Sequence, residues 1–125
     1  MNWNKPCAYD EDQKRRFNAT ARTRLRRLAT ALRLPAGSFD LRSNKGGIAV
    51  SGEVTLHHER IYIQVSQPAF GGDTSGGVLI RTCRGRRDDV GGLNHFVSLT
   101  MLDDIDALSD RVRRIAPDLH GAEAA

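Results

Sequence analysis

Long apolar runs are missing from this sequence of 125 residues. No stretch approaches the roughly 18 uninterrupted apolar residues of a membrane-spanning helix, and the first residues lack the apolar segment of a signal peptide. We therefore expect no membrane partner and, by default, a cytoplasmic location. The two cysteines, Cys7 and Cys83, are too few for a disulfide framework and too far apart for a paired metal-binding motif.

Aromatic residues are scarce as well, at 6% of the chain, and the aromatic motif of an RNA-recognition sheet is absent. Recognition of single-stranded nucleic acid by base stacking therefore has little support in the sequence. Zinc-finger spacing and a recognition-helix pair are not found either. With 39% hydrophobic and 27% charged residues, the composition is that of an ordinary globular protein, and the length fits one domain.

A helical pattern begins near Asp10. Asp10 and Gln13 have the spacing of a capping-box variant. Apolar residues then recur every three or four positions, at Phe17, Ala21, Leu25, Leu28 and Leu32. This period predicts an amphipathic helix. Because Pro35 disfavours helical geometry at the residue before it, the helix is expected to end near Arg33 or Leu34.

After Gly37 the apolar period changes from about 3.6 residues to two, which indicates β-strands. We predict five strands in one antiparallel meander. They cover residues 39–41, 48–56, 61–65, 78–83 and 95–101. Turns are predicted at 44–47 and 57–60, and Gly52 is expected to form a bulge inside the second strand.

A second helical pattern follows the strands. Its apolar stripe consists of Ile105, Leu108, Val112 and Ile115. The helix is expected to begin near Thr100 or Asp103 and to end at Pro117. The order helix, five strands, helix predicts an α+β fold with both helices on one face of the sheet. The expected organisation is an N-terminal arm (1–9), a single domain (10–117) and a disordered tail (118–125).

Positive charge is concentrated in one segment, although the net charge of the chain is only +4. The segment from Gln13 to Phe39 holds eight basic residues and no acidic one. The eight are Lys14, Arg15, Arg16, Arg22, Arg24, Arg26, Arg27 and Arg33. Arginine dominates the basic residues, a bias that phosphate recognition favours and that a GC-rich gene would equally produce. Local fields decide which partners approach, so the first helix is the candidate interaction element.

Four of these arginines share one side of the predicted helix. Arg15, Arg22, Arg26 and Arg33 fall within about 40° of arc, in a row of roughly 27 Å that we call the arginine row. Acidic residues before the first turn can pair with the bases there, but none follows within the helix. Arg22 and Arg26 form a like-charge pair four residues apart, which costs roughly 0.2–0.5 kcal/mol. An anionic group outside the helix is expected to offset that cost.

Three explanations compete for the arginine row. The acidic residues of the second helix, Asp103, Asp106 and Asp110, are expected to point away from its apolar stripe and into solvent, which argues against internal pairing. A solvated, solubilising face needs no partner at all. An external polyanion is the third, and nucleic acid is the commonest, because aligned arginines that neutralise phosphates release counterions whatever the base sequence.

A second set of basic residues, which we call the basic cluster, follows the fourth predicted strand. It consists of Arg81, Arg84, Arg86 and Arg87. An exposed, glycine-containing loop can extend guanidinium groups to a nucleic-acid backbone, so Arg84, Arg86 and Arg87 join the arginine row as candidate binding residues. Asp88 and Asp89 follow directly, so pairing within the turn is the alternative.

Catalytic and metal-binding groups do not converge in the sequence. His57, His58 and Glu59 are adjacent, but neighbours on an extended chain point to opposite faces, so no metal site is expected. Cys83 and His95 could form a couple if their strands pair, although a packed cysteine and a hydrogen-bonded histidine are the simpler interpretation. We expect no cofactor and no catalysis. An enzyme centred on this couple and the loop 84–92 is a minor alternative.

The sequence thus predicts a small non-enzymatic binding protein that docks on nucleic acid or a ribonucleoprotein through the arginine row, assisted by the basic cluster. The alternative is a protein-interaction module, such as an inhibitor or adaptor, whose row meets an acidic protein surface. In one form of that alternative the surface is the acidic second helix of another copy, which would make a homodimer that salt weakens.

Overall fold

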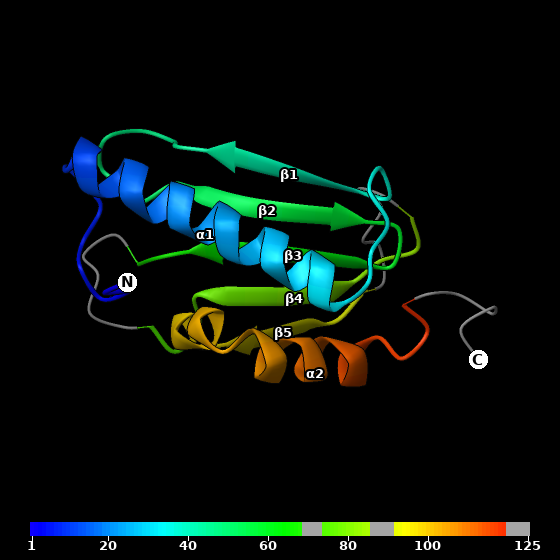
Figure 1. Cartoon of the computed structure of the whole chain (residues 1–125). Helices are drawn as coiled ribbons and strands as arrows, with labels where there is room; N and C mark the ends of the chain where they lie inside the picture. The colour runs from blue at the N-terminus through cyan, green and yellow to red at the C-terminus, as the bar shows by residue number, and fades with distance from the viewer. Residues whose placement is uncertain (69–73, 86–91, 120–125) are drawn as a thin grey trace.

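A computed structural model of the chain describes residues 1–68, 74–85 and 92–119 (Figure 1). Its elements are α1 (Glu11–Ala31), β1 (Phe39–Asn44), β2 (Glu53–His58), β3 (Ile61–Ser66), β4 (Val78–Thr82), β5 (Asn94–Val97), the 3₁₀ helix η1 (Leu99–Asp103) and α2 (Ile105–Ile115). The strands form one antiparallel sheet in sequence order. Both helices lie on the same face of it. The predicted α+β fold is confirmed.

The start and end of α1 follow from local hydrogen bonds. A carboxylate oxygen of Asp10 accepts the backbone N–H of Gln13 at 3.0 Å, which caps the helix as predicted. At the other end, the N–H groups of Arg33 and Leu34 each donate at 3.0 Å to the carbonyls of Thr30 and Ala29. This Schellman arrangement places Arg33 in the left-handed region, with φ of 58°. The helix therefore ends two residues before the predicted boundary, and Arg33 lies outside it.

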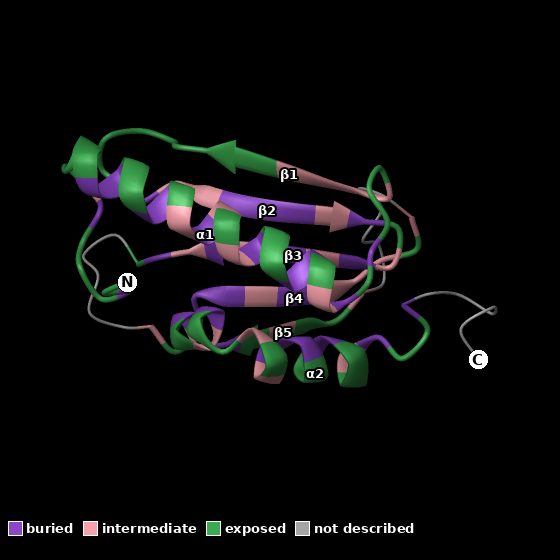
Figure 2. Ribbon diagram, in the orientation of Figure 1, coloured by how far each residue is buried: buried purple, intermediate pink, exposed green. Residues whose placement is uncertain are grey.

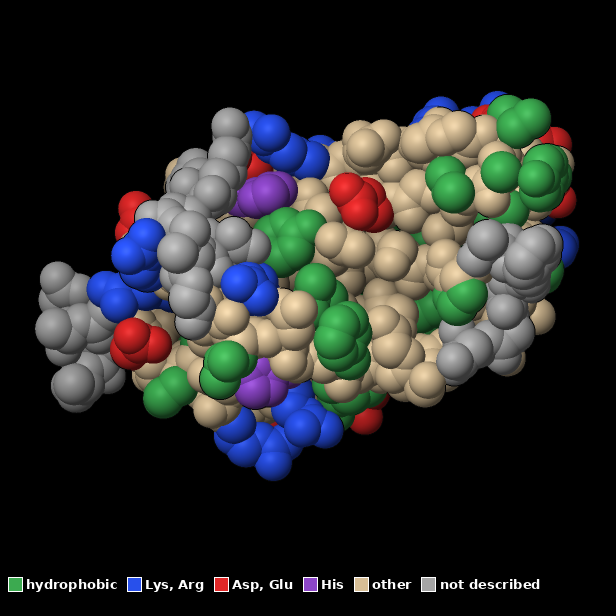
Figure 3. Space-filling model, turned by 180° about the vertical axis from the view of Figure 1, so that it is seen from behind, with side chains coloured by type: hydrophobic (Ala, Val, Ile, Leu, Met, Phe, Trp, Pro, Cys, Tyr) green, Lys and Arg blue, Asp and Glu red, His purple; other side chains and the backbone are tan. Residues whose placement is uncertain are grey.

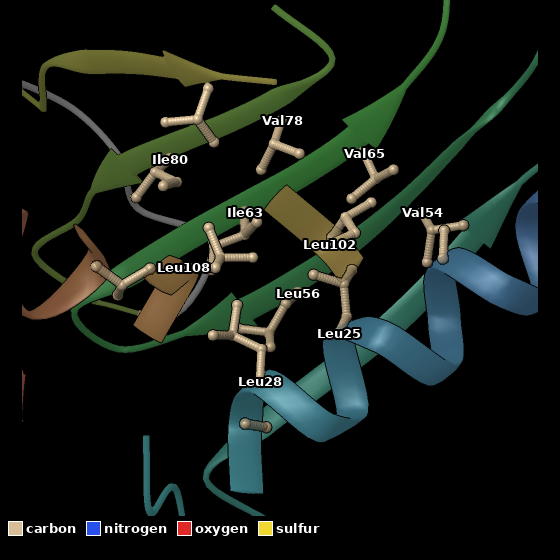
Figure 4. Packing of buried hydrophobic residues seen from close by; sticks show 14 of the residues in the cluster. Leu25, Leu28, Val54, Leu56, Ile63, Val65, Val78, Ile80, Leu102 and Leu108 are labelled. Carbon is tan, nitrogen blue, oxygen red and sulfur yellow. The ribbon is translucent and has the colours of Figure 1, made fainter. Parts of the chain in front are cut away.

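The hydrophobic core fills the space between the helices and one face of the sheet. On β3, Ile61, Ile63 and Val65 are buried while the residues between them are half-buried, so alternate side chains point toward the helices. Figure 2 shows the buried positions on the sides of both helices that face the sheet, and Figure 4 shows Leu25 and Leu28 of α1 directed into this layer. Burial of each such Leu or Ile side chain stabilises the folded state by roughly 1.5–3 kcal/mol relative to leaving it exposed.

The predicted strand at 48–56 is wrong in its first half. Ile48 and Val50 are 67% and 43% exposed and lie in the loop between β1 and β2. The carbonyl of Ile48 is engaged by the N-terminal segment, because it accepts the backbone N–H of Tyr9 at 2.6 Å. Gly52, predicted to form a bulge, instead ends this loop with φ of 75°, a conformation that suits glycine.

Other predicted boundaries are also shifted. His57 and His58 belong to β2 rather than to a turn, and the chain reverses over Glu59 and Arg60. Strand β5 ends at Val97, four residues earlier than predicted, because the hydroxyl of Ser98 accepts the N–H of Thr100 and caps η1.

The start of α2 also differs from the predicted residues, Thr100 and Asp103, which both belong to η1. The helix begins at Ile105, and its N-cap is Asp104, whose carboxylate accepts the N–H of Ala107 at 3.1 Å. The predicted apolar stripe packs as expected at Leu108 and Val112, which are fully buried. A short 3₁₀ helix therefore occupies the stretch in which the sequence pattern suggested strand and then α-helix.

The first residues pack into the domain. Trp3 is 3% exposed, contacts Phe17 edge to face at 5.7 Å between ring centroids, and donates its indole N–H to Asp103 at 2.8 Å. The backbone N–H of Cys7 donates to the side chain of Gln67 at 3.0 Å. Burial raises the pKa of the Cys7 thiol to about 11. The segment 1–9 is thus anchored by two buried side chains.

Candidate anion-binding surface

The outward side of α1 carries the arginine row. The helix buries one stripe of residues against the sheet: Gln13, Lys14, Phe17, Asn18, Ala21, Leu25, Leu28 and Ala29. Arg15 and Arg26 remain exposed, and Arg22 is half-buried. Lys14, one of the eight bases of this segment, is only 1% exposed and donates its ammonium to the carbonyl of Gly47 at 2.8 Å, so it is not part of the surface.

The members of the row have different surroundings. Arg15 pairs with the carboxylate of Asp12, as the spacing of the first turn allows. The Nη1 atom of Arg22 donates to the hydroxyl of Ser43 on β1 at 3.3 Å, which ties it to the sheet without neutralising it. In the part of the chain that the structure describes, the guanidinium group of Arg26 has no hydrogen-bond or ion-pair partner. Uncompensated positive charge is thus found toward the second half of the helix.

The expected 27 Å row on one helical face is not formed in full, because α1 ends at Ala31 and Arg33 has a left-handed backbone. Arg33 is exposed and its guanidinium group has no partner among the described residues, so it contributes charge at the C-terminal end of the helix. The row on the helix proper therefore runs from Arg15 to Arg26. A helical wheel assigns an angle to each residue as if the helix continued, so it could not show that the helix ends before Arg33.

Tertiary packing brings a further arginine to the same end. Arg113 of α2, 45% exposed, donates its Nη2 group to the carbonyl of Ala31 at 2.6 Å. Arg27 lies one helical turn before Ala31 and is exposed. We call Arg26, Arg27, Arg33 and Arg113 the C-terminal arginine cluster. Two of its members, Arg27 and Arg113, were not among the residues chosen from the sequence.

The signals for these two residues were weak. Arg27 falls on another side of the helical wheel from the arginine row. Arg113 lies in the last turn of its own helix, where basic residues are favoured by the helix dipole whatever their function. It also complements the negative end of the α1 dipole, so part of its charge has a structural role. Only the packing of α2 beside α1 places it in the cluster.

Carboxylates near the cluster are few. Asp110 is 74% exposed and lies 4.0 Å from Arg113, and no described carboxylate pairs with Arg26, Arg27 or Arg33. Asp103 was expected to point into solvent, and this is wrong. Because η1 packs beside α1, Asp103 accepts from Arg24 at 3.3 Å as well as from Trp3. Asp103 thus pairs with Arg24, which lies outside the row.

The basic cluster after β4 is only partly described. Arg81 lies in β4 and donates to the side-chain carbonyl of Asn94 at 2.5 Å. Arg84 is exposed, and Arg86 and Arg87 fall outside the described residues. Figure 1 shows that β4, α1 and α2 all end on the same side of the molecule. Arg84 is thus at the same end as Arg33, whereas Arg15 is at the opposite end of α1.

The histidines and cysteines do not converge. His57 and His58 project to opposite faces of β2, as expected for neighbours on a strand. Strands β4 and β5 do pair, but His95 is opposite Ile80, three residues before Cys83, and the Cys83 thiol donates to the carbonyl of His58 at 3.5 Å. Within residues 1–68, 74–85 and 92–119, no three potential metal ligands are grouped.

Comparison of the chain with protein-family models, with curated proteins and with solved structures found no match. Among its described helices, none is both long and apolar enough to cross a bilayer. The candidate surface therefore rests on its geometry and charge alone.

Proposed function

We propose that the chain is a non-enzymatic binding protein that docks on nucleic acid or a ribonucleoprotein through the C-terminal half of α1. One observation carries the proposal. Arg26, Arg27 and Arg33 are exposed, and no carboxylate in the described part of the chain pairs with them. Guanidinium groups in such a position bind phosphate oxygens through two parallel hydrogen bonds.

The shape of the surface favours an extended anion over a small one. Arg22 and Arg26 are four residues apart, roughly 6 Å along the helix axis, and Arg33 lies two residues beyond the end of the helix. No concave site that would enclose a single phosphate is needed for such contacts. A polyanion that lies along α1 meets several guanidinium groups in succession, and its binding is expected to be tolerant of base sequence.

The roles follow from position. Arg26, Arg27 and Arg33 contact phosphates, and Arg22, held by Ser43, supplies a fourth positive charge beside them. Arg113 fixes the end of α1 through the carbonyl of Ala31 and adds charge there. Arg84 extends the contact from the same end of the molecule, and Arg86 and Arg87, which lie outside the described residues, are proposed to assist it. Arg15, paired with Asp12, contributes least.

A protein-interaction module is the second candidate, and one observation favours it. Asp106 and Asp110 of α2 are exposed, so a second copy could place them against the C-terminal arginine cluster. Such an assembly would weaken as ionic strength rises, because exposed ion pairs are screened by salt. Sedimentation of the chain alone at low and high salt separates this candidate from the first.

Fluorescence anisotropy with a short labelled DNA duplex tests the first candidate. The double variant Arg26→Glu/Arg33→Glu is expected to lose most duplex binding, because it reverses two phosphate contacts. The matched control is Arg15→Glu/Arg16→Glu, which changes the net charge equally at the other end of α1. Retained binding in the first variant, or equal losses in both, would overturn the proposed surface.

A further inference from the structure

The face of the sheet that points away from the helices carries a second set of side chains. Figure 3 shows this face, with hydrophobic and histidine side chains among polar ones over its middle, an acidic side chain beside them and basic side chains mostly toward its edges. The strand register arranges the outward residues in two rows across the sheet. One row is Asp40, His57, Tyr62, Arg81 and Asn94, and the other is Arg42, Thr55, Gln64, Leu79 and Phe96.

Two rings at the centre of this face are held in place. The ring centroids of His57 and Tyr62 are 5.1 Å apart and tilted by 58°. The hydroxyl of Tyr62 donates to the side-chain oxygen of Gln64 at 2.7 Å, and the Nε2 atom of His57 lies 3.1 Å from the hydroxyl of Thr55. Each ring is thus fixed by the residue two positions away on its own strand. A fixed ring loses little conformational entropy when a ligand stacks on it.

A third ring is more exposed. Phe96 of β5 is 60% exposed and stands opposite Leu79 in the register. Two strand spacings and two residues of rise separate Phe96 from Tyr62, which is about 12 Å. The two rings are therefore far enough apart to contact different bases of one strand. A large aromatic side chain left in water on the surface of a sheet is a typical stacking platform.

The charge of this region complements a phosphate backbone. Arg81 is directly opposite Tyr62 in the register and stands between it and Asn94, to which its guanidinium group donates. Arg84 follows at the end of the same strand and is exposed. The acidic residues of this face, Asp40 and Glu53, are on β1 and β2, on the far side of Tyr62 from Phe96. The path from Tyr62 to Phe96 thus crosses basic and neutral side chains.

The polar residues on the face argue for bases rather than for a protein surface. Gln64 and Asn94 lie among the rings, and covering them with an apolar protein surface would bury amide groups at a cost. In the described part of the chain, the Nε2 group of Gln64 has no hydrogen-bond partner, so it can donate to the edge of a stacked base.

We infer that the outward face of strands β3 to β5 binds single-stranded nucleic acid, with bases stacked on Tyr62 and Phe96 and a phosphate near Arg81. This site is separate from the α1 surface, since the sheet lies between them, and it does not depend on the proposed function. Low aromatic content argued against stacking in the sequence. The register overturns that argument by bringing rings from separate strands to one face.

The experiment uses a short labelled oligo-dT and a duplex of the same length, both measured by anisotropy at moderate salt. Tyr62→Ala and Phe96→Ala should each weaken oligo-dT binding by about 5-fold to 150-fold, the range measured when a stacking ring is removed. Tyr62→Phe keeps the ring and should retain most of the affinity. The control is Tyr9→Ala, which removes an exposed ring outside the sheet and should change nothing.

The outcomes separate the two surfaces. Loss of oligo-dT binding in Tyr62→Ala with unchanged duplex binding supports the inference, and so do ultraviolet cross-links to oligo-dT that map to β3 and β5. Equal oligo-dT affinity in Tyr62→Ala and Tyr9→Ala overturns it, even when Arg26→Glu/Arg33→Glu abolishes duplex binding. A dimer that dissociates on Phe96→Asp, without oligo-dT binding, also overturns it, because a second copy then occupies the face.

Discussion

The two faces of this molecule present different chemistry on one scaffold. The helical face has exposed guanidinium groups of α1 and lacks an exposed ring among its described helical residues, whereas the sheet face has His57, Tyr62 and Phe96 together with charges of both signs, such as Asp40 and Arg81. The charge of the first face comes from one continuous segment. The rings of the sheet face come from three strands, and only the strand register brings them to the same face. A surface built from one continuous segment can therefore be predicted from the sequence, whereas a surface assembled by strand pairing cannot.

The largest effect on stability is expected from a cavity in the hydrophobic core, which supports both faces. Ile63 is fully buried between the sheet and the helices. Ile63→Ala should lower the free energy of unfolding by about 2–5 kcal/mol, because it removes buried methyl groups and leaves a cavity. Chemical denaturation measures this loss.

The matched control is Ile48→Ala, at an isoleucine that is 67% exposed. Its effect is expected to stay within about 0.5 kcal/mol. Similar losses in the two variants would mean that Ile48 is packed in solution and that the loop between β1 and β2 is wrongly assigned to the surface.

The second effect distinguishes the two faces by their salt dependence. Arg26→Ala/Arg33→Ala should lower the slope of log affinity against log salt for duplex DNA by about 2, one for each phosphate contact. Tyr62→Ala should weaken oligo-dT binding and leave its slope nearly unchanged, because stacking releases few counterions. Salt titrations of both variants provide the measurement. A large slope change in Tyr62→Ala would remove the distinction between the faces.

The overall fold was accessible from sequence because its signals are local and repeated. The period of 3.6 residues in α1, the alternation in β3 and the change of period after Gly37 each report which side of an element is buried. Failures occurred where the pattern was short. The alternation at Ile48 and Val50 covers three residues, and there a contact with Tyr9 rather than strand pairing decides the structure.

The candidate site residues also divide into those that local sequence could identify and those that required the tertiary structure. Arg22 and Arg26 could be chosen from the helical wheel, because both lie within a regular helix. Arg33 could not be placed, since it is itself the left-handed residue that follows the end of the helix. Arg113 required the packing of α2 against the end of α1, and the proximity of His57 to Tyr62 required the β2–β3 register.

A third prediction concerns the end of the helical face. Arg33→Gly should raise the free energy of unfolding by about 1 kcal/mol, because glycine adopts the left-handed conformation without the steric cost that other residues have. Thermal denaturation measures the change, and duplex binding should weaken in the same variant because a charge is lost.

The control for this variant removes the same charge from the middle of the helix. Arg26→Gly is expected to lower stability by about 1 kcal/mol, the cost of glycine in a helix interior. The two variants thus share a charge change and differ in the sign of the stability change. Destabilisation by Arg33→Gly would show that its side chain makes contacts that the structure lacks.

The smallest expected effect concerns Cys7, which is buried in the N-terminal segment. Burial raises the pKa of the Cys7 thiol to about 11 from 9.0, so the protonated thiol is favoured in the folded state. Its contribution to stability is complete below about pH 9 and is lost as the pH rises toward about 11, since the unfolded chain then ionises first. Denaturation of the wild type and Cys7→Ala across this range should show a steeper decline in the wild type.

Thiol labelling gives a simpler check of the same contrast. Near neutral pH, native protein should be alkylated at the half-buried Cys83 and protected at Cys7 until it unfolds. Mass spectrometry identifies the labelled peptide. Rapid labelling of Cys7 in the native protein would contradict the packing of the first nine residues against the domain.

The central claim is that guanidinium groups at the C-terminal half of α1 lack internal counter-charges and meet a polyanion. Its most direct test is the affinity of the wild-type chain for labelled duplex DNA across a range of salt concentrations. With four to six phosphate contacts, log affinity should fall against log salt with a slope of about −4 to −5. A slope near zero, or no binding at low salt, would contradict the claim.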